Sequence, residues 1–355
     1  MKLPRRKFLH LTAGTAALSV GARFAWAQTY PSRPARIVVG FPPGTSSDIT
    51  ARLIGQWLSE RLGQQFIVEN RPGAGTNIAA ETVVHATPDG YTLLWVTQTN
   101  AINATLYDTL NFNFIRDIQP IASILRVPAV MSVTPSFPTK TVPEFIAYAK
   151  ANPGKINYAS PGIGSSVHVF GELFKMMAGV DLVMVHYRGS FFPDLLGGQV
   201  QVTINPTPSS IDFIRAGKLR ALAVTTAMRQ EVLPDIPTVG EFIPGYEATV
   251  WFGIGAPNNT PVERIEKLNR EINAGLVDPK IKKRLTDLGA LPMPMTPTEF
   301  GQLLTVETDG PRWSGQPTSN RSNRTELYPP RNTESCGDVR FGSKGDITAE
   351  LTYVC

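Results

Sequence analysis

The sequence predicts an α/β protein that is built as two lobes. Between residues 30 and 309, short apolar runs typical of strands alternate with longer stretches whose apolar residues recur at helical spacing. The order strand, helix, strand, helix, strand occurs near the start of the chain and begins again after about residue 128. This order favours parallel sheets with helices on both faces.

The first lobe begins with an apolar strand at residues 36–40. A helix follows at residues 48–62, because apolar residues fall on one of its faces and Ser47 or Asp48 can cap its first turn. The unit is completed by a strand at 65–69, a helix at 77–85 and a strand at 91–96.

The second lobe, for which we predict residues 128–251, repeats this alternation. Its expected elements are strands at 129–133, 157–160, 183–187, 200–204 and 219–225, helices at 142–151 and 166–178, and a short helix around 194–196. After a strand at 251–256, the pattern is helical, at 261–276, 279–288 and 297–307. We expect these last helices to pack on the first lobe, which then combines residues 28–127 with 252–309. The candidate hinges are 125–128 and 248–252.

The two ends of the chain differ in composition from the part between them. Residues 1–27 combine a basic head, a short apolar run and the end Ala25-Trp26-Ala27, which is the pattern of a signal peptide. The pair Arg5-Arg6 indicates the twin-arginine type, with an ordinary export signal as the alternative. We therefore expect a soluble periplasmic protein after cleavage. Residues 310–355 are polar and rich in Pro and Gly, which predicts a disordered tail.

Charge and cysteine content exclude several functions. The formal charge of +5 arises in residues 1–27, which hold five basic residues and no acid, and the rest of the chain has 29 basic and 29 acidic residues. No nucleic-acid partner is therefore expected. The two cysteines, Cys336 and Cys355, both lie in the tail. A disulfide framework, a cysteine-held zinc and a cysteine nucleophile are thus not expected in the lobes.

Two loops between a strand and a helix are candidates for binding an anion. The segments 41–48 and 160–168 are rich in Gly, Ser and Pro, and each opens a helix whose N-terminus offers N–H groups and a positive dipole end. Each loop alone is also compatible with an ordinary capped turn. One such loop in each lobe favours a cleft that grips a small anion from both sides. A third Gly-rich turn, at 70–77, is equally consistent with a structural role.

The sequence lacks the common signals of catalysis or of a bound cofactor. The loop at 41–48 does not fit a Walker A motif, and the loop at 160–168 lacks the third glycine of a dinucleotide fingerprint. The histidines outside the signal, His85, His168 and His186, have no metal-type spacing, and no G-x-S-x-G motif occurs. Binding is therefore favoured over catalysis, and neither cofactor nor metal is expected.

Several linked segments, in order along the chain, resemble one family. They are Phe-Pro-Pro-Gly at 41–44, Val-Glu-Asn-Arg-Pro-Gly-Ala-Gly at 68–75, Pro-Asp-Gly-Tyr-Thr-Leu-Leu at 88–94, Ala-Lys-Ala-Asn-Pro-Gly-Lys at 149–155, Leu-Gly-Gly-Gln-Val at 196–200, Ala-Gly-Lys-Leu-Arg-Ala-Leu-Ala-Val-Thr at 216–225 and Pro-Asp-Ile-Pro-Thr at 234–238. In these segments the chain is similar to the tripartite tricarboxylate transporter substrate-binding receptors of the TctC/Bug type. The resemblance runs from about residue 30 to about residue 307.

The resemblance implies a fold, a function and a set of binding residues. The fold is a two-lobed periplasmic binding protein, type II-like, with a hinged ligand cleft. The function is capture of a small organic acid by lobe closure and its delivery to the membrane permease of a tripartite tricarboxylate-type transporter, by a monomer. Backbone N–H groups, hydroxyls and water typically hold the anion in this family. The positions expected to bind it are Phe41, Pro43, Gly44, Thr45, Asp48, Thr99, Asn100, Ala101, Ser160, Gly162, Gly164, Ser165, Ser166, Tyr187, Gly189 and Asn205.

The chain departs from the family at three places. Thr45 stands where a second glycine usually follows Gly44, and the loop at 186–194 is shorter than usual. Phe191 and Phe192 in that loop either face the ligand or, as we favour, repack the shortened loop. After residue 307 a polar tail replaces the family's final helix, which suggests a frameshifted or divergent end.

Two other functions fit the same sequence. One is a ligand-sensing module that reports to a membrane signalling protein, and the less favoured one is a periplasmic enzyme on a similar fold. The residues do not single out one ligand, because no charged signature marks the expected pocket.

Overall fold

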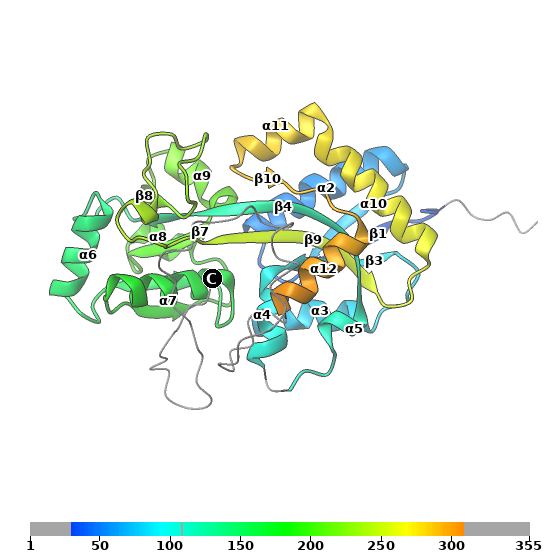
Figure 1. The fold of residues 1–355 in the computed structure, drawn as a ribbon, viewed down its shortest axis with the longest axis horizontal. Coiled ribbons are helices and arrows are strands. Elements are labelled where there is room, and N and C mark those ends of the chain that lie inside the picture. Colours follow the sequence, from blue (N-terminus) through cyan, green and yellow to red (C-terminus); the bar gives the residue numbers. More distant parts are fainter. Residues whose placement is uncertain (1–29, 108, 309–355) are drawn as a thin grey trace, which may run out of the picture.

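The computed structural model describes residues 30–107 and 109–308. The segments predicted as a signal peptide and as a polar tail lie outside the described residues. Two α/β lobes lie side by side and are joined by long strands that run from one lobe into the other (Figure 1). This arrangement confirms the predicted two-lobed α/β fold.

The first lobe is built on a parallel unit of three strands. β1 (Ala35–Val39) pairs with β2 (Phe66–Asn70) on one side and with β3 (Thr92–Thr97) on the other. The connecting helices are α2 (Ser46–Leu62) and α3 (Asn77–Val84), the latter preceded by the short helix η2 (Ala74–Thr76). α2 begins two residues earlier than predicted, because Thr45 rather than Ser47 or Asp48 is its cap.

Two long antiparallel strands connect the lobes. β4 (Ile118–Val133) and β9 (Thr249–Pro257) pair along most of their length, with register shifts near Pro120 and Ser123. The sequence predicted only the second part of β4, because two prolines interrupt the apolar pattern of its first part, and the shifts in register accommodate this irregularity. The candidate hinges face each other here, since Leu125 pairs with Phe252 and Val127 with Val250.

The second lobe surrounds the far half of β4. There β4 pairs antiparallel with β7 (Val202–Pro206) and β8 (Arg220–Val224), while β5 (Asn157–Ser160) is parallel to β6 (Val183–His186) and β7. The helices of this lobe are α6 (Val142–Ala151), α7 (Ser166–Ala178), α8 (Phe192–Gly197), α9 (Thr207–Arg215) and the short η3 (Val239–Glu241). α9 was not predicted, because its first turn, Thr-Pro-Ser-Ser, has the composition of a loop.

The C-terminal helices pack on the first sheet and its helices. α10 (Val262–Val277) lies against α2, where the indole N–H of Trp57 donates to the carbonyl of Glu271 at 2.8 Å. α12 (Pro297–Thr308) packs on β4 and on α4 (Gln98–Leu106), and its Phe300 meets Trp251 edge to face. The remaining elements are α5 (Phe114–Asp117), α11 (Pro279–Asp287) and β10 (Leu291–Pro292).

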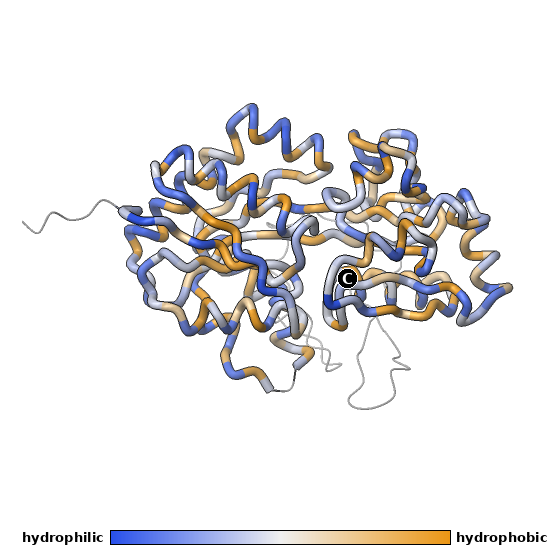
Figure 2. Tube along the Cα trace, turned by 180° about the vertical axis from the view of Figure 1, so that it is seen from behind, coloured by the Kyte–Doolittle hydropathy of each residue, from blue (hydrophilic) through white to orange (hydrophobic). Residues whose placement is uncertain are grey.

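Hydrophobic residues are concentrated on the inner strands, whereas the outer helices carry many hydrophilic ones (Figure 2). One apolar cluster continues through both lobes along β4 and β9. Over the described part of the chain, we find no helix with both the length and the apolarity needed to cross a membrane.

Candidate ligand-binding site

A cleft lies between the lobes, where β9 passes from one to the other. The empty space in it is about 560 Å³ when the part open to solvent is included. None of the described residues that line it is charged. Its polar lining comprises Thr45, Ser46, Ser47, Thr97, Gln98, Thr99, Ser166, Ser190, Asn205 and Ser209. Its remaining lining is formed by Phe41, Pro161, Val167, Gly189, Phe191, Phe192, Pro206, Val250 and Phe252.

Four helices direct their N-termini to this cleft. α2 and α4 come from the first lobe, and α7 and α9 from the second. Each contributes at least one residue of its first turn to the lining, namely Ser46 and Ser47 of α2, Gln98 and Thr99 of α4, Ser166 and Val167 of α7, and Ser209 of α9. The N-terminus of a helix carries partial positive charge and unpaired N–H groups. The cleft can therefore attract an anion without a lysine or arginine.

Asp48 supports the first loop from behind the cleft. Its carboxylate accepts hydrogen bonds from the backbone N–H of Gly44 at 2.9 Å and from the amide of Asn70 at 2.9 Å, and it pairs with Arg52 at 2.8 Å. Burial raises the pKa of Asp48, but the hydrogen bonds from Arg52, Gly44 and Asn70 outweigh burial and lower it below its usual value. Asp48 is thus a charged group that fixes the loop.

Thr45 fits the first loop despite its branched side chain. Its backbone is extended, at φ −78° and ψ 162°, which a β-branched residue adopts readily. Its hydroxyl donates to the carbonyl of Pro42 at 2.8 Å and accepts from the N–H of Asp48 at 3.4 Å, so it caps α2. The left-handed conformation in this loop falls on Gly44 instead, at φ 78°.

Serines hold the second loop in shape. The hydroxyl of Ser165 donates to the carbonyl of Gly162 at 2.7 Å and accepts from the N–H of His168 at 3.2 Å, which caps α7. Ser160 also contacts Gly162, since its hydroxyl accepts from the N–H of Gly162 at 3.2 Å. These contacts leave Ser166, the first residue of α7, facing the cleft.

His168 connects the second loop to α7. The N–H of Gly164 donates to its Nδ1 at 3.3 Å, which requires that Nδ1 carry no proton. Burial is the largest of three causes that lower the pKa of His168 to about 4, and the other two are the neighbouring His186 and Lys175. The ring of His186 lies edge to face at 5.2 Å between centroids. At neutral pH the imidazole is therefore neutral and accepts the hydrogen bond.

The structure divides the predicted binding residues into two groups. Those that line the cleft are Phe41, Thr45, Thr99, Ser166, Gly189 and Asn205. Those that do not line it are Pro43, Gly44, Asp48, Asn100, Ala101, Ser160, Gly162, Gly164, Ser165 and Tyr187. Many of the second group shape the loops: Asn100, for example, accepts from the N–H of Thr97 at 2.8 Å and completes the cap of α4. The hydroxyl of Tyr187 donates to Asp194 at 2.8 Å.

Other lining residues were missed or weighed differently. Ser209 was overlooked, although the segment 207–210 follows a strand and opens a helix with two serines, as the recognised loops do. Val250 and Phe252 were considered only as part of a hinge. Phe191 and Phe192 both repack and line the cleft, since they stack at 4.9 Å between centroids and are 4% and 8% exposed.

An uncharged cleft between two α/β lobes, approached by four helix N-termini, defines a solute-binding protein of the periplasmic type. Comparisons with known proteins agree with this class. The sequence profile of the tripartite tricarboxylate transporter family receptors matches residues 50–310. The chain is 35% identical over 294 residues to protein BugT of Bordetella pertussis, covering 81% of this chain and 90% of BugT. The chain belongs to the tripartite tricarboxylate transporter receptor family, and is a receptor rather than an enzyme.

Solved structures show the same fold with ligands. A protein of R. palustris, solved with adipate, superposes with a TM-score of 0.77 at 38% identity, covering 79% of this chain and 95% of that one. MatC of Rhodopseudomonas palustris, solved with bound malate, superposes with a TM-score of 0.74 at 32% identity, covering 79% of this chain and 97% of that one. These likenesses confirm the periplasmic binding protein fold.

Proposed function

We propose that this protein captures a small organic acid by closing its lobes and delivers it to the membrane permease of a tripartite tricarboxylate-type transporter. The observation that carries the proposal is the convergence of four helix N-termini on a cleft without charged lining. A carboxylate is the common small anion that such donors suit. The adipate and malate in the two R. palustris structures support this ligand class.

Lobe closure follows from the way β4 and β9 connect the lobes. We propose that the first lobe comprises residues 28–127 and 252–309 and the second residues 128–251. The two boundaries lie close together across one strand pair, because Val127 is in register with Val250 and Pro128 with Thr249. A bend at this pair changes the separation of the lobes, and an acid that touches both lobes favours the closed form. The periplasm is the proposed compartment, reached through the signal in residues 1–27.

A ligand screen tests the proposal directly. The full chain is melted alone and with citrate, malate, adipate, benzoate and an amino-acid panel, and positive results are measured by titration calorimetry. An acid at about a hundred times its dissociation constant adds about 2.7 kcal/mol, which raises the melting midpoint by several degrees at about 2–4 °C per kcal/mol. A cooperative melt that no acid shifts, together with no calorimetric binding, contradicts the proposal.

A further inference from the structure

One end of the cleft has a hydrogen-bond donor that no protein group satisfies. Thr99, in the first turn of α4, is 1% exposed and lines the cleft, yet its hydroxyl has no hydrogen-bond partner. A buried hydroxyl without a partner is unfavourable. A carboxylate oxygen placed there accepts from this hydroxyl and lies at the positive end of α4.

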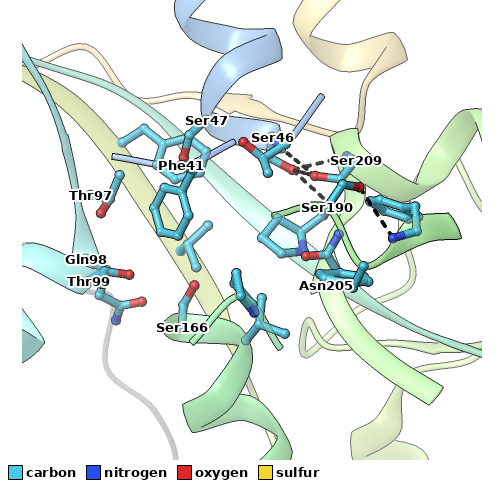
Figure 3. A pocket seen from close by; sticks show the side chains of 18 of the residues that line it. Phe41, Ser46, Ser47, Thr97, Gln98, Thr99, Ser166, Ser190, Asn205 and Ser209 are labelled. Carbon is cyan, nitrogen blue, oxygen red and sulfur yellow. Dashed lines mark hydrogen bonds between the residues drawn. The ribbon is translucent and has the colours of Figure 1, made fainter. Parts of the chain in front are cut away.

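The neighbouring groups complete this end of the cleft. Gln98 also lines the cleft in the first turn of α4, but its amide donates to Glu307 at 3.4 Å and its oxygen only accepts, so its side chain gives a carboxylate no donor. Ser166 brings the N-terminus of α7 from the second lobe. Figure 3 shows Thr97, Gln98 and Thr99 on one side of the cleft, with Ser166 below them. A single carboxylate here contacts both lobes.

At the opposite end of the cleft, two first-turn N–H groups are already bonded to protein groups. The N–H of Ser46 donates to the hydroxyl of Ser209 at 2.6 Å, and the N–H of Ser209 donates to the hydroxyl of Ser46 at 3.1 Å. Figure 3 shows this pair across the cleft from Thr99. The N–H of Ser46 in α2 and the N–H of Ser209 in α9 are thus each bonded to the hydroxyl of the other residue. A second carboxylate at this end must separate Ser46 from Ser209. The described lining offers no lysine or arginine to compensate the second negative charge.

The space between the two ends is apolar and largely aromatic. Phe41 comes from the first lobe and Phe191 from the second, with Phe252 of β9 beside them in the lining. Phe252 packs on Trp95 at 5.9 Å between centroids, and Phe191 stacks on Phe192, so both rings are held in place. Such a wall suits an apolar ring better than a chain of hydroxyls or a second charge.

We infer that the preferred ligand is a monocarboxylate with an apolar, ring-sized body, held by its carboxylate at Thr99 and by its ring between Phe41 and Phe191. This inference rests on the proposed function, of which it names the substrate class. It predicts that a second carboxylate on the ligand lowers affinity.

Calorimetric titration of the full chain with benzoate, terephthalate, adipate and malate tests the inference. We expect benzoate to bind at least about tenfold more tightly than the three diacids, because each diacid brings a second charge to a site without a cation. If adipate, malate or terephthalate binds as tightly as benzoate or more tightly, the inference is overturned while carboxylate capture stands. If none of the acids in this panel or in the wider screen binds, both fail.

Two pairs of variants locate the contacts. Thr99→Val is expected to weaken benzoate binding by about tenfold through loss of one hydrogen bond to a charged group. Thr139→Val is its control, because the Thr139 hydroxyl is also buried without a partner but lies outside the cleft lining. Phe191→Leu is expected to weaken benzoate binding more than Phe213→Leu, since Phe213 packs on Phe192 without lining the cleft. Unchanged benzoate affinity in Thr99→Val, in a variant that melts as cooperatively as its control, overturns the assigned carboxylate position.

Discussion

The hydroxyl oxygens of Ser46 and Ser209 lie 2.6 Å apart and join the first turn of α2 to the first turn of α9. The two residues are separated by 163 positions in the sequence and belong to different proposed lobes. Ser46 also donates to the carbonyl of Pro206 at 3.1 Å. This buried contact joins the two lobes directly.

Ser209→Ala is expected to loosen this arrangement. The N–H of Ser46 loses its acceptor, which costs about 1 kcal/mol and weakens binding of the tightest acid by about fivefold at most. Small-angle scattering of the ligand-free protein should show a larger radius of gyration. Ser132→Ala is a matched control, since its buried hydroxyl has no partner. An unchanged radius and affinity in Ser209→Ala contradict a role in holding the lobes.

Gly164→Ala should keep the lobes apart. A Cβ at Gly164, where φ is +79°, would lie 2.7 Å from the side-chain oxygen of Asn103 and 2.7 Å from Leu106, both in α4 of the other lobe. We expect ligand binding to weaken by more than about tenfold, because the closed form must shift α4 away from the added methyl group. A tenfold loss of affinity corresponds to about 1.4 kcal/mol.

Gly162→Ala separates this clash from backbone strain. Gly162 also has a positive φ, at +138°, but nothing lies within 4 Å of its added Cβ. Both variants should lose comparable stability in urea unfolding, since each forces alanine into an unfavourable backbone conformation. Equal losses of ligand affinity in the two variants would show that strain, and not lobe contact, is responsible.

Acid should destabilise the protein through His168. Its pKa is about 4 in the folded chain, below the ordinary value of 6.5. As the pH falls from 6.5 to 4, the unfolded chain takes up the proton first, so the free energy of unfolding falls by about 3 kcal/mol at 1.36 kcal/mol per pKa unit. Below pH 4 the titration of His168 lowers the free energy of unfolding no further. Urea unfolding at stepped pH measures the slope.

His168→Asn should flatten that slope, because asparagine offers an acceptor to the N–H of Gly164 without titrating. His186→Asn should instead raise the pKa of His168, since the positive form of His186 disfavours a second positive charge. A wild-type pH slope in His168→Asn would assign the acid sensitivity to other groups.

Asp48→Asn is expected to weaken ligand binding while the fold persists. The neutral side chain loses its ion pair with Arg52 and places an amide against the amide of Asn70. The support of Gly44 and the first loop is thereby weakened, with a loss of about 1–3 kcal/mol in stability. Calorimetry and urea unfolding measure both effects. Arg52→Gln serves as a comparison, because it removes the exposed partner of Asp48 and of Asn70 but keeps the carboxylate that supports Gly44.

Much of the fold could be predicted because local patterns agree with it. The βαβαβ unit of the first lobe has strands and helices whose apolar spacing is unambiguous, and the loops that open α2 and α7 carry their own capping residues. The first half of β4 could not be predicted, since Pro120 and Pro128 contradict a strand unless its partner β9 is known. α9 could not be predicted either, because its first turn, Thr-Pro-Ser-Ser, has the composition of a loop.

The candidate site was less predictable than the fold. A loop motif shows which segment approaches a ligand but not which of its residues face it, so Thr45 and Asp48 were equivalent in the sequence although one lines the cleft and the other supports it. The Ser46–Ser209 contact depends on how the two lobes meet, and no local pattern encodes that. Phe252 lines the cleft because β9 crosses between the lobes.

The position of β9 in the sheet bears on the order in which the chain folds during synthesis. β9 lies between β3 and β4, so the first sheet has a missing central strand until residues 249–257 have been made. The strands of the second lobe, β5 to β8 and the far half of β4, all precede β9 in the chain. The second lobe can therefore assemble first, and the lobe that contains the N-terminal strand is completed last. A nascent chain halted before residue 249 should protect the amides of β5 and β7 from exchange and leave those of β3 open.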